Sequence, residues 1–190
     1  MKIIGIIQAS GLSKRMGKNK LYLDIRGKPM YQYIVDEALD TKLNQVIVVS
    51  NENKILDYAD KKGAKSILNE ESEKGQSRSI IKALEFAQDF DAYLFMVADQ
   101  PFLKAETINI MIDRFKNSQK GILLPLYCGM RASPGLFDKK YKSELNKLKG
   151  DENGRIVVQK YRDDVEFIEI GDRKQGIDID TYSDYERYCL

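Results

Sequence analysis

The sequence contains no histidine among its 190 residues. This absence excludes Ser-His-Asp and Cys-His catalysis, and it removes the commonest general base near neutral pH together with His-ligated metals. An enzyme built from this chain must therefore use chemistry that needs little from such a base. Phosphoryl or nucleotidyl transfer to an acceptor that is already ionised meets this condition, because positioning and charge neutralisation dominate there.

Cysteine pairs, long apolar runs and an excess of one charge are also missing. Cys128 and Cys189 lie far apart without CxxC spacing, which excludes a cysteine zinc cage and argues against a disulfide-rich secreted domain. The N-terminal apolar stretch is too short for a signal peptide, and no run approaches the ~18 residues of a membrane span. The 31 cations and 29 anions nearly cancel, so no global field favours nucleic acid or an anionic membrane. We expect a cytoplasmic protein that binds neither.

Short β-rich apolar runs alternate with segments of helical period. The pattern predicts strands at 3–7, 46–50, 93–97, 122–124 and 165–168. It predicts helices at 31–39, 53–62, 77–88, 105–117, 139–148 and 154–161. This alternation indicates right-handed βαβ units and a Rossmann-like, doubly wound, mostly parallel α/β sheet, in a single domain over 1–190.

The pattern loosens after about Pro125, and 127–135 shows neither period clearly. Ligands of doubly wound sheets bind outside the carboxyl ends of the strands. The loops after Ile7 and Val97, and the segment near Asp178, are therefore the expected places for a site.

The first of these loops has the sequence GLSKRMGKNK. It narrowly misses a P-loop, because five residues rather than four separate Gly11 from Gly17, and it lacks the dinucleotide fingerprint GxGxxG. The ingredients of an anion site remain. Gly11 allows close backbone approach, Ser13 offers a hydroxyl group, and Arg15 and Lys20 can counter phosphate charge. Taken alone, a surface turn with solvated lysines is an equally open interpretation.

Two acidic segments could hold a metal ion. In ADQP at 98–101, Asp99 follows a predicted strand and offers the carboxylate oxygen that Mg²⁺ prefers, although capping of the next turn is the commoner role of such an Asp taken alone. In DIDT at 178–181, alternation would place Asp178 and Asp180 on one face, although either could cap a terminal helix starting near Ser183. Two distant carboxylates plus a cationic loop would together form a metal–triphosphate site.

A further stretch, EKGQSRSIIKAL at 73–84, opens an amphipathic helix with a glycine and two small hydroxyl residues. The positive end of this helix could face a ribose, a base or a phosphate. Ordinary helix capping by Ser77 is the alternative, and we expect it in either case.

These pieces, in this order, resemble the nucleotidyltransferases of molybdenum cofactor biosynthesis, the MobA-like NTP transferase family. The chain is most similar to the molybdenum cofactor cytidylyltransferases within that group. The family signature A-x-G-x-S-x-R-M-G-x-x-K is matched by Ala9, Gly11, Ser13, Arg15, Met16, Gly17 and Lys20. KGQSRS, ADQP, DIDT and GDENGR also resemble family blocks, so the likeness covers essentially the whole chain.

The sequence departs from the family pattern at several positions. Ala9-Ser10-Gly11 replaces the usual A-A-G, and Asn153 stands where glycine is common, although Asn also tolerates a left-handed backbone. RASP at 131–134 differs from an R-G-(H/N)-P block on the acceptor side. Guanylyltransferase relatives tend to carry a G-G pair at 10–11 and G-P-L-x-G near 75–80, so Ser10 and GQSRS resemble the cytidylyl branch instead.

The resemblance implies Mg²⁺-dependent transfer of CMP from CTP to the phosphate of molybdopterin, with release of pyrophosphate. It implies the catalytic residues Arg15, Lys20 and Asp99. The metal ligands it implies are Asp99 and Asp180, with Asp178 as the alternative to Asp180. The nucleotide-binding residues it implies are Gln8, Ala9, Ser10, Gly11, Ser13, Gln76 and Ser77.

Other functions remain open at this stage. The chain could be another cytidylyl- or guanylyltransferase of this fold, using GTP, or using a sugar or alditol phosphate as acceptor. It could also be a non-catalytic nucleotide- or pterin-binding chaperone that serves a client molybdoenzyme. A nucleic-acid module is disfavoured by the balanced charge and by the absence of aromatics interleaved in 11–20.

Overall fold

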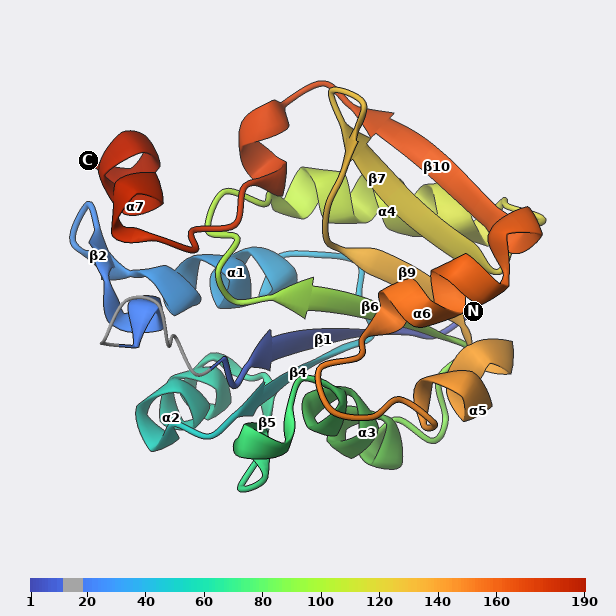
Figure 1. Ribbon diagram of the computed structural model, residues 1–190, viewed down its shortest axis with the longest axis horizontal. Helices are drawn as coiled ribbons and strands as arrows, with labels where there is room; N and C mark the ends of the chain where they lie inside the picture. Colours follow the sequence, from blue (N-terminus) through green and yellow to red (C-terminus); the bar gives the residue numbers. More distant parts are fainter. Residues whose placement is uncertain (12–18) are drawn as a thin grey trace.

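The computed structural model describes residues 1–11 and 19–190, and in these residues an eight-stranded sheet is flanked by helices on both faces (Figure 1). Its strands run in the order β10-β7-β9-β6-β1-β4-β5, and β8 pairs with β7. The strands are β1 Ile3–Ala9, β4 Gln45–Ser50, β5 Lys65–Leu68, β6 Ala92–Val97, β7 Ile122–Tyr127, β8 Met130–Arg131, β9 Gly135–Asp138 and β10 Val165–Ile170. The predicted mostly parallel, doubly wound α/β sheet is confirmed.

The centre of the sheet is buried on both faces, which explains why its strands are continuous apolar runs. In β1, Ile3 and Ile7 join one hydrophobic cluster, whereas Ile4 and Ile6 join the other. Alternate side chains of a strand point to opposite faces, so a strand covered on both sides needs apolar residues at successive positions.

Each of the two hydrophobic clusters is completed by helices. Buried residues of α1 Met30–Leu39, α2 Asn53–Lys62, α4 Ala105–Lys116 and α7 Tyr182–Cys189 belong to the first cluster. Those of α3 Ser77–Phe86, α5 Lys142–Leu145 and α6 Gly154–Lys160 belong to the second. No helix of the described part is long and apolar enough to cross a membrane.

The strand order creates a switch point at β1. This strand pairs in parallel with β4 on one side and with β6 on the other, from which the sheet continues in opposite directions. The carboxyl ends of the three strands therefore lie at one edge, where Ala98 N–H donates to the Gln8 carbonyl at 3.1 Å. Doubly wound sheets bind ligands at this kind of position.

The second half of the chain differs from the expectation in three places. The irregular 127–135 stretch contains a tight turn, with positive φ at Cys128 (51°) and Gly129 (81°), that leads from β7 into β8. β9 follows and pairs antiparallel with both β6 and β7. The helix predicted at 139–148 is shorter, because Lys139–Tyr141 forms a 3-10 turn before α5. In the first half of the chain, β5 was also not expected, since this edge strand is short and only half buried.

Substituting Leu94→Ala should destabilise the fold through the loss of a buried side chain at the centre of the sheet. Leu94 lies on β6 and is fully buried. We expect a loss of about 2–5 kcal/mol in the free energy of unfolding, measured by urea denaturation. The matched control is Leu68→Ala on the edge strand β5, where Leu68 is 43% exposed. Equal losses for both variants would contradict the assigned core.

Candidate functional site

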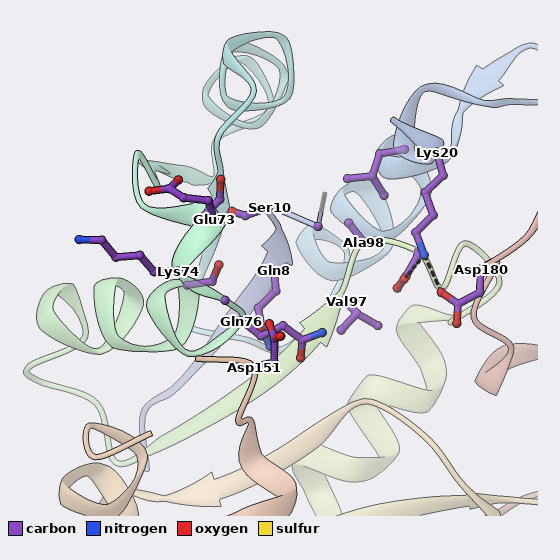
Figure 2. Close-up of a pocket in the computed structure, with 16 residues that line it drawn as sticks. Gln8, Ser10, Lys20, Glu73, Lys74, Gln76, Val97, Ala98, Asp151 and Asp180 are labelled. Carbon is purple, nitrogen blue, oxygen red and sulfur yellow. Dashed lines mark hydrogen bonds and ion pairs between the residues drawn. The ribbon is translucent and has the colours of Figure 1, made fainter. Parts of the chain in front are cut away.

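A cleft of about 480 Å³ opens at the carboxyl edge of the sheet (Figure 2). Its floor comes from the ends of β1 and β6, through Gln8, Ser10, Val97 and Ala98. One wall is the segment 72–76 together with Ser79 of α3. The cleft thus lies at the switch point of the sheet, where the loops after the first and the third parallel strand were expected to form a site.

One end of the cleft holds a charged triad. The Lys20 ammonium lies 2.6 Å from Asp99 Oδ2 and 2.8 Å from Asp180 Oδ1. The Lys20 side chain is 11% exposed, the Asp99 side chain 22% and the Asp180 side chain 37%. Burial by itself lowers the pKa of Lys20, but Asp99 and Asp180 outweigh it, and the net pKa is raised. Lys20 is therefore fully charged at neutral pH.

Three separate segments bring this triad together. Lys20 begins a 3-10 turn, Lys20–Tyr22, whose first residues are fixed by the Asn19 side chain accepting from Leu21 N–H. Ile179 is fully buried, and its N–H donates to the Asp99 carbonyl at 2.9 Å. This bond holds the chain just before Asp180 against the end of β6.

The position of Asp180 is fixed from its other side by the start of α7. Thr181 and Asp184 form a capping box, in which each side chain accepts from the backbone N–H of the other residue. The Asp180 N–H also donates to Asp184 Oδ2 at 3.2 Å. The capping role expected near Ser183 therefore belongs to Thr181 and Asp184, and the Asp180 carboxylate contacts Lys20 at the cleft.

Asp178 adds a third carboxyl group close to the triad, although it does not line the cleft. Asp178 is exposed as a residue, but its carboxyl group is partly desolvated by the protein around it. This desolvation and the negative charges of Asp99 and Asp180 raise the pKa of Asp178 to about 6. Negative charge is thus concentrated at this end of the cleft, a condition that favours a bound cation.

The fit of a metal ion can be tested on Asp99. Its Oδ1 atom is buried and has no hydrogen-bond partner among the described residues, while Oδ2 contacts Lys20. A buried carboxylate oxygen without a partner is unfavourable, and a hard cation would satisfy it. Within residues 1–11 and 19–190, no group of three or more acidic, His or Cys side chains could hold a metal by itself. A metal here would need further oxygen ligands from a bound substrate or water.

The other end of the cleft is built by the approach of two loops. Gly75 has φ 104°, and a Cβ placed on it would lie 2.2 Å from the Gly150 carbonyl carbon. Ser77 N–H donates to the Gly150 carbonyl at 3.0 Å. Glycine is therefore required at position 75 both by backbone conformation and by space. This contact places Asp151 in the lining beside Gln76.

One expectation about this end of the cleft is wrong. Ser77 is not the helix cap, because Gln76 occupies that position without a capping side-chain bond, and Ser77 is the first helical residue and is 1% exposed. Asn153 does not adopt a left-handed backbone. It has φ −141° and caps α6, with its side chain accepting from Arg155 N–H.

The structure brings together most of the residues predicted from sequence. Those that line the cleft are Gln8, Ser10, Gly11, Lys20, Gln76, Asp99 and Asp180. Ala9, Ser77 and Asp178 are not part of the lining, and Ala9 and Ser77 are buried. Ser13 and Arg15 lie outside the described residues. Lining residues not nominated before include Lys74, Gly75 and Asp151, which belong to the KGQSRS and GDENGR blocks.

Residues 5–165 match the family model described as the MobA-like NTP transferase domain. The chain belongs to this family. It is a nucleotidyltransferase, as its relatives are. It is 26% identical over 196 residues to the purine catabolism protein PucB of Bacillus subtilis, covering 97% of this chain and 94% of PucB. It is 28% identical to a probable molybdenum cofactor guanylyltransferase of Pyrococcus horikoshii, covering 85% of this chain and 79% of that protein.

Solved structures give the same fold. Rv0371c from Mycobacterium tuberculosis H37Rv superposes with a TM-score of 0.84 at 25% identity, covering 98% of this chain and 96% of that one. A CMP:2-keto-3-deoxy-manno-octonic acid synthetase complexed with CTP superposes with a TM-score of 0.79 at 14% identity, covering 98% and 96%. The second likeness concerns the fold alone, and it confirms a sheet of the nucleotide-diphospho-sugar transferase type.

Substituting Gly75→Ala should both destabilise the protein and close the cleft end that Gly75 builds. The added methyl group must displace the Gly150 backbone, and the positive φ adds strain. Gly63→Ala is the matched control, because Gly63 also has positive φ (93°) but nothing within 4 Å of its Cβ position. We expect Gly75→Ala to lower the melting temperature more than Gly63→Ala and to weaken nucleotide binding. Equal behaviour of the two variants would contradict the tight loop contact.

Proposed function

We propose that this nucleotidyltransferase moves CMP from CTP to the phosphate of molybdopterin or of the molybdenum cofactor, and releases pyrophosphate. The observation that carries the proposal is one cleft with a cationic and acidic triad at one end and an amide-rich end at the other. Figure 2 shows Lys20 and Asp180 at the first end and Lys74, Gln76 and Asp151 at the second. A nucleoside triphosphate has the same division between its phosphates and its base.

Residues at the charged end would bind the triphosphate. Lys20 would neutralise the β- and γ-phosphates, and Arg15 would assist in the family role implied by its motif. Asp99 and Asp180 would hold Mg²⁺, which supplies the charge neutralisation that phosphoryl transfer needs. The buried Asp99 Oδ1, for which the described part of the chain offers no hydrogen-bond partner, supports this assignment. Ser10 and Gly11 line the cleft, and the backbone at Ala9–Gly11 would contact the nucleotide.

The acceptor chemistry agrees with the composition. A phosphate oxygen of the acceptor attacks the α-phosphorus of CTP, and the bond from that phosphorus to the pyrophosphate oxygen breaks. Because the acceptor oxygen is already ionised, no side chain has to remove a proton from it. The chain contains no histidine, which is consistent with this route. Transfer of the product to a client molybdoenzyme in the cytoplasm is also part of the proposal.

The choice of CTP rests on the first loop and on the segment after Lys74. Ser10-Gly11 and GQSRS differ from the G-G and G-P-L-x-G segments of guanylyltransferase relatives. Relatives of this chain include proteins named molybdenum cofactor guanylyltransferase and others named 2-C-methyl-D-erythritol 4-phosphate cytidylyltransferase. Transfer of GMP from GTP is therefore the second candidate, and it is favoured by the names of the molybdenum relatives.

The function is tested by pyrophosphate release. The purified protein is mixed with Mg²⁺, molybdenum-loaded pterin and each of CTP, GTP, ATP and UTP. We expect release with CTP that depends on the pterin and stops when the metal is removed with EDTA. Pyrophosphate release with GTP but not with CTP would show that GTP is the nucleotide substrate. Pyrophosphate release with a sugar phosphate in place of the pterin would show that the acceptor is different. No release in any mixture, with tight nucleotide binding, would favour a non-catalytic carrier.

Asp99→Asn should reduce turnover by about 10²-fold or more, because it removes a charge from the proposed metal and triphosphate site. Initial rates of pyrophosphate release across a range of Mg²⁺ concentrations measure the effect, and circular dichroism reports whether the fold is kept. Asp57→Asn, at an exposed position of α2, makes the same chemical change away from the cleft and should leave the rate unchanged. Near-normal turnover of Asp99→Asn would refute the metal assignment.

A further inference from the structure

The side chain of Gln76 is exposed, and a helix cap orients its amide through a hydrogen bond. Asn153 Oδ1 accepts a hydrogen bond from the backbone N–H of Arg155 at 3.0 Å. A backbone N–H can only donate, so the oxygen of Asn153 must face it and the Asn153 amide cannot be flipped. The Nδ2 group of Asn153 is thereby turned toward Gln76.

The orientation of the Asn153 amide in turn determines the orientation of the Gln76 amide. Asn153 Nδ2 donates to Gln76 Oε1 at 3.2 Å. Since Oε1 is engaged in this bond, the Nε2 group of Gln76 is the part that remains for a ligand. Among the described residues none accepts a hydrogen bond from it, and Gln76 lines the cleft. The donor of Gln76 is therefore free for a ligand, whereas its acceptor already takes one hydrogen bond from Asn153 and keeps one lone pair.

We propose that Asn153 sets the hydrogen-bond polarity of Gln76, so that the cleft offers an N–H₂ group to the base and thereby favours cytosine over guanine. The inference rests on the proposed function and names the residue pair that selects the nucleotide. The pairing edge of cytosine carries two adjacent acceptors, O2 and N3. The pairing edge of guanine carries two donors, N1–H and N2–H₂, beside a single acceptor, O6. A donor in a fixed position can therefore bond to either of two adjacent atoms on the pairing edge of cytosine, but to only one atom on the pairing edge of guanine.

The position of Gln76 in the cleft supports contact with a base rather than with phosphate. Gln76 lies on the side opposite Lys20 and Asp180, with Gln8 and Val97 between them (Figure 2). Asp151 lies at the same end and can accept from the amino group of either base, so it does not discriminate between them. Asn153 makes its contact with Gln76 through its side-chain amide, which a glycine at that position would lack. It acts through Gln76 and is a positioning residue.

The test is Asn153→Asp, which has the same shape and keeps the helix cap. The new carboxylate can accept from the Arg155 N–H as well as Asn does. It cannot donate, so Gln76 must turn its Nε2 group toward it and present Oε1 to the cleft. CTP and GTP are titrated calorimetrically, with Mg²⁺, into the full chain and into the variant. We expect the ratio of CTP to GTP affinity to fall by about tenfold or more, with an unchanged melting temperature.

Two further variants make the result specific. Gln76→Glu offers only acceptors to the cleft and should shift the ratio in the same direction. Asn146→Asp adds the same charge at the exposed end of α5 and should leave the ratio unchanged. A general effect of the added negative charge would weaken the binding of CTP and GTP equally, and the ratio of their affinities would stay the same.

The outcomes separate the inference from the proposed function. An unchanged ratio in both Asn153→Asp and Gln76→Glu, or a shift toward CTP, would overturn the inference while leaving the transferase activity intact. Tight CTP binding with the expected shift but no pyrophosphate release would support the inference and overturn the catalytic proposal. Wild-type protein that binds neither nucleotide would overturn both.

Discussion

The parallel pairing of β1 with β4 on one side and β6 on the other is the constraint on which the functional features of this protein depend. Parallel strands end at the same edge, so the loop after Ala9 and the turn at Asp99 become neighbours although they lie far apart in sequence. Both faces of these strands are covered by helices, which makes the edge the place where polar groups can gather. The cleft is a consequence of this arrangement.

The charged end of the cleft shows how backbone contacts place a reactive group. Asp99 is held by the end of β6, and its carbonyl accepts from Ile179, which is fully buried. That single bond brings the C-terminal segment to the sheet, and Asp180 follows it into contact with Lys20. Charges that would repel one another as three isolated carboxylates are stabilised by the ammonium group between two of them. In a bound complex, a divalent cation would face the carboxylates, and the phosphates of the ligand would face the Lys20 ammonium group.

The opposite end depends on close backbone approach instead of charge. Gly75 allows the segment before α3 to touch the loop at Gly150, and this contact sets Gln76 beside Asn153. The hydrogen-bond polarity of one helix cap can then reach the cleft through two amide groups. Two amide groups linked in this way could recognise a base without a charged side chain, because the first amide orients the second.

The sequence by itself determined the class of fold, since continuous apolar strands alternating with amphipathic helices can be buried only in a covered, mostly parallel sheet. It also predicted Lys20, Asp99 and Asp180 as site residues, which the structure places in one cleft, because their motifs are local and lie at strand ends or next to them. Only the tertiary structure decided that Lys20 lies between the two carboxylates, that Ser77 is buried and that Asn153 orients Gln76. β9 likewise escaped prediction, because a short antiparallel strand gains its stability from two neighbours that are distant in sequence. Local patterns fix which segments fold, whereas contacts between distant segments fix which side chains meet.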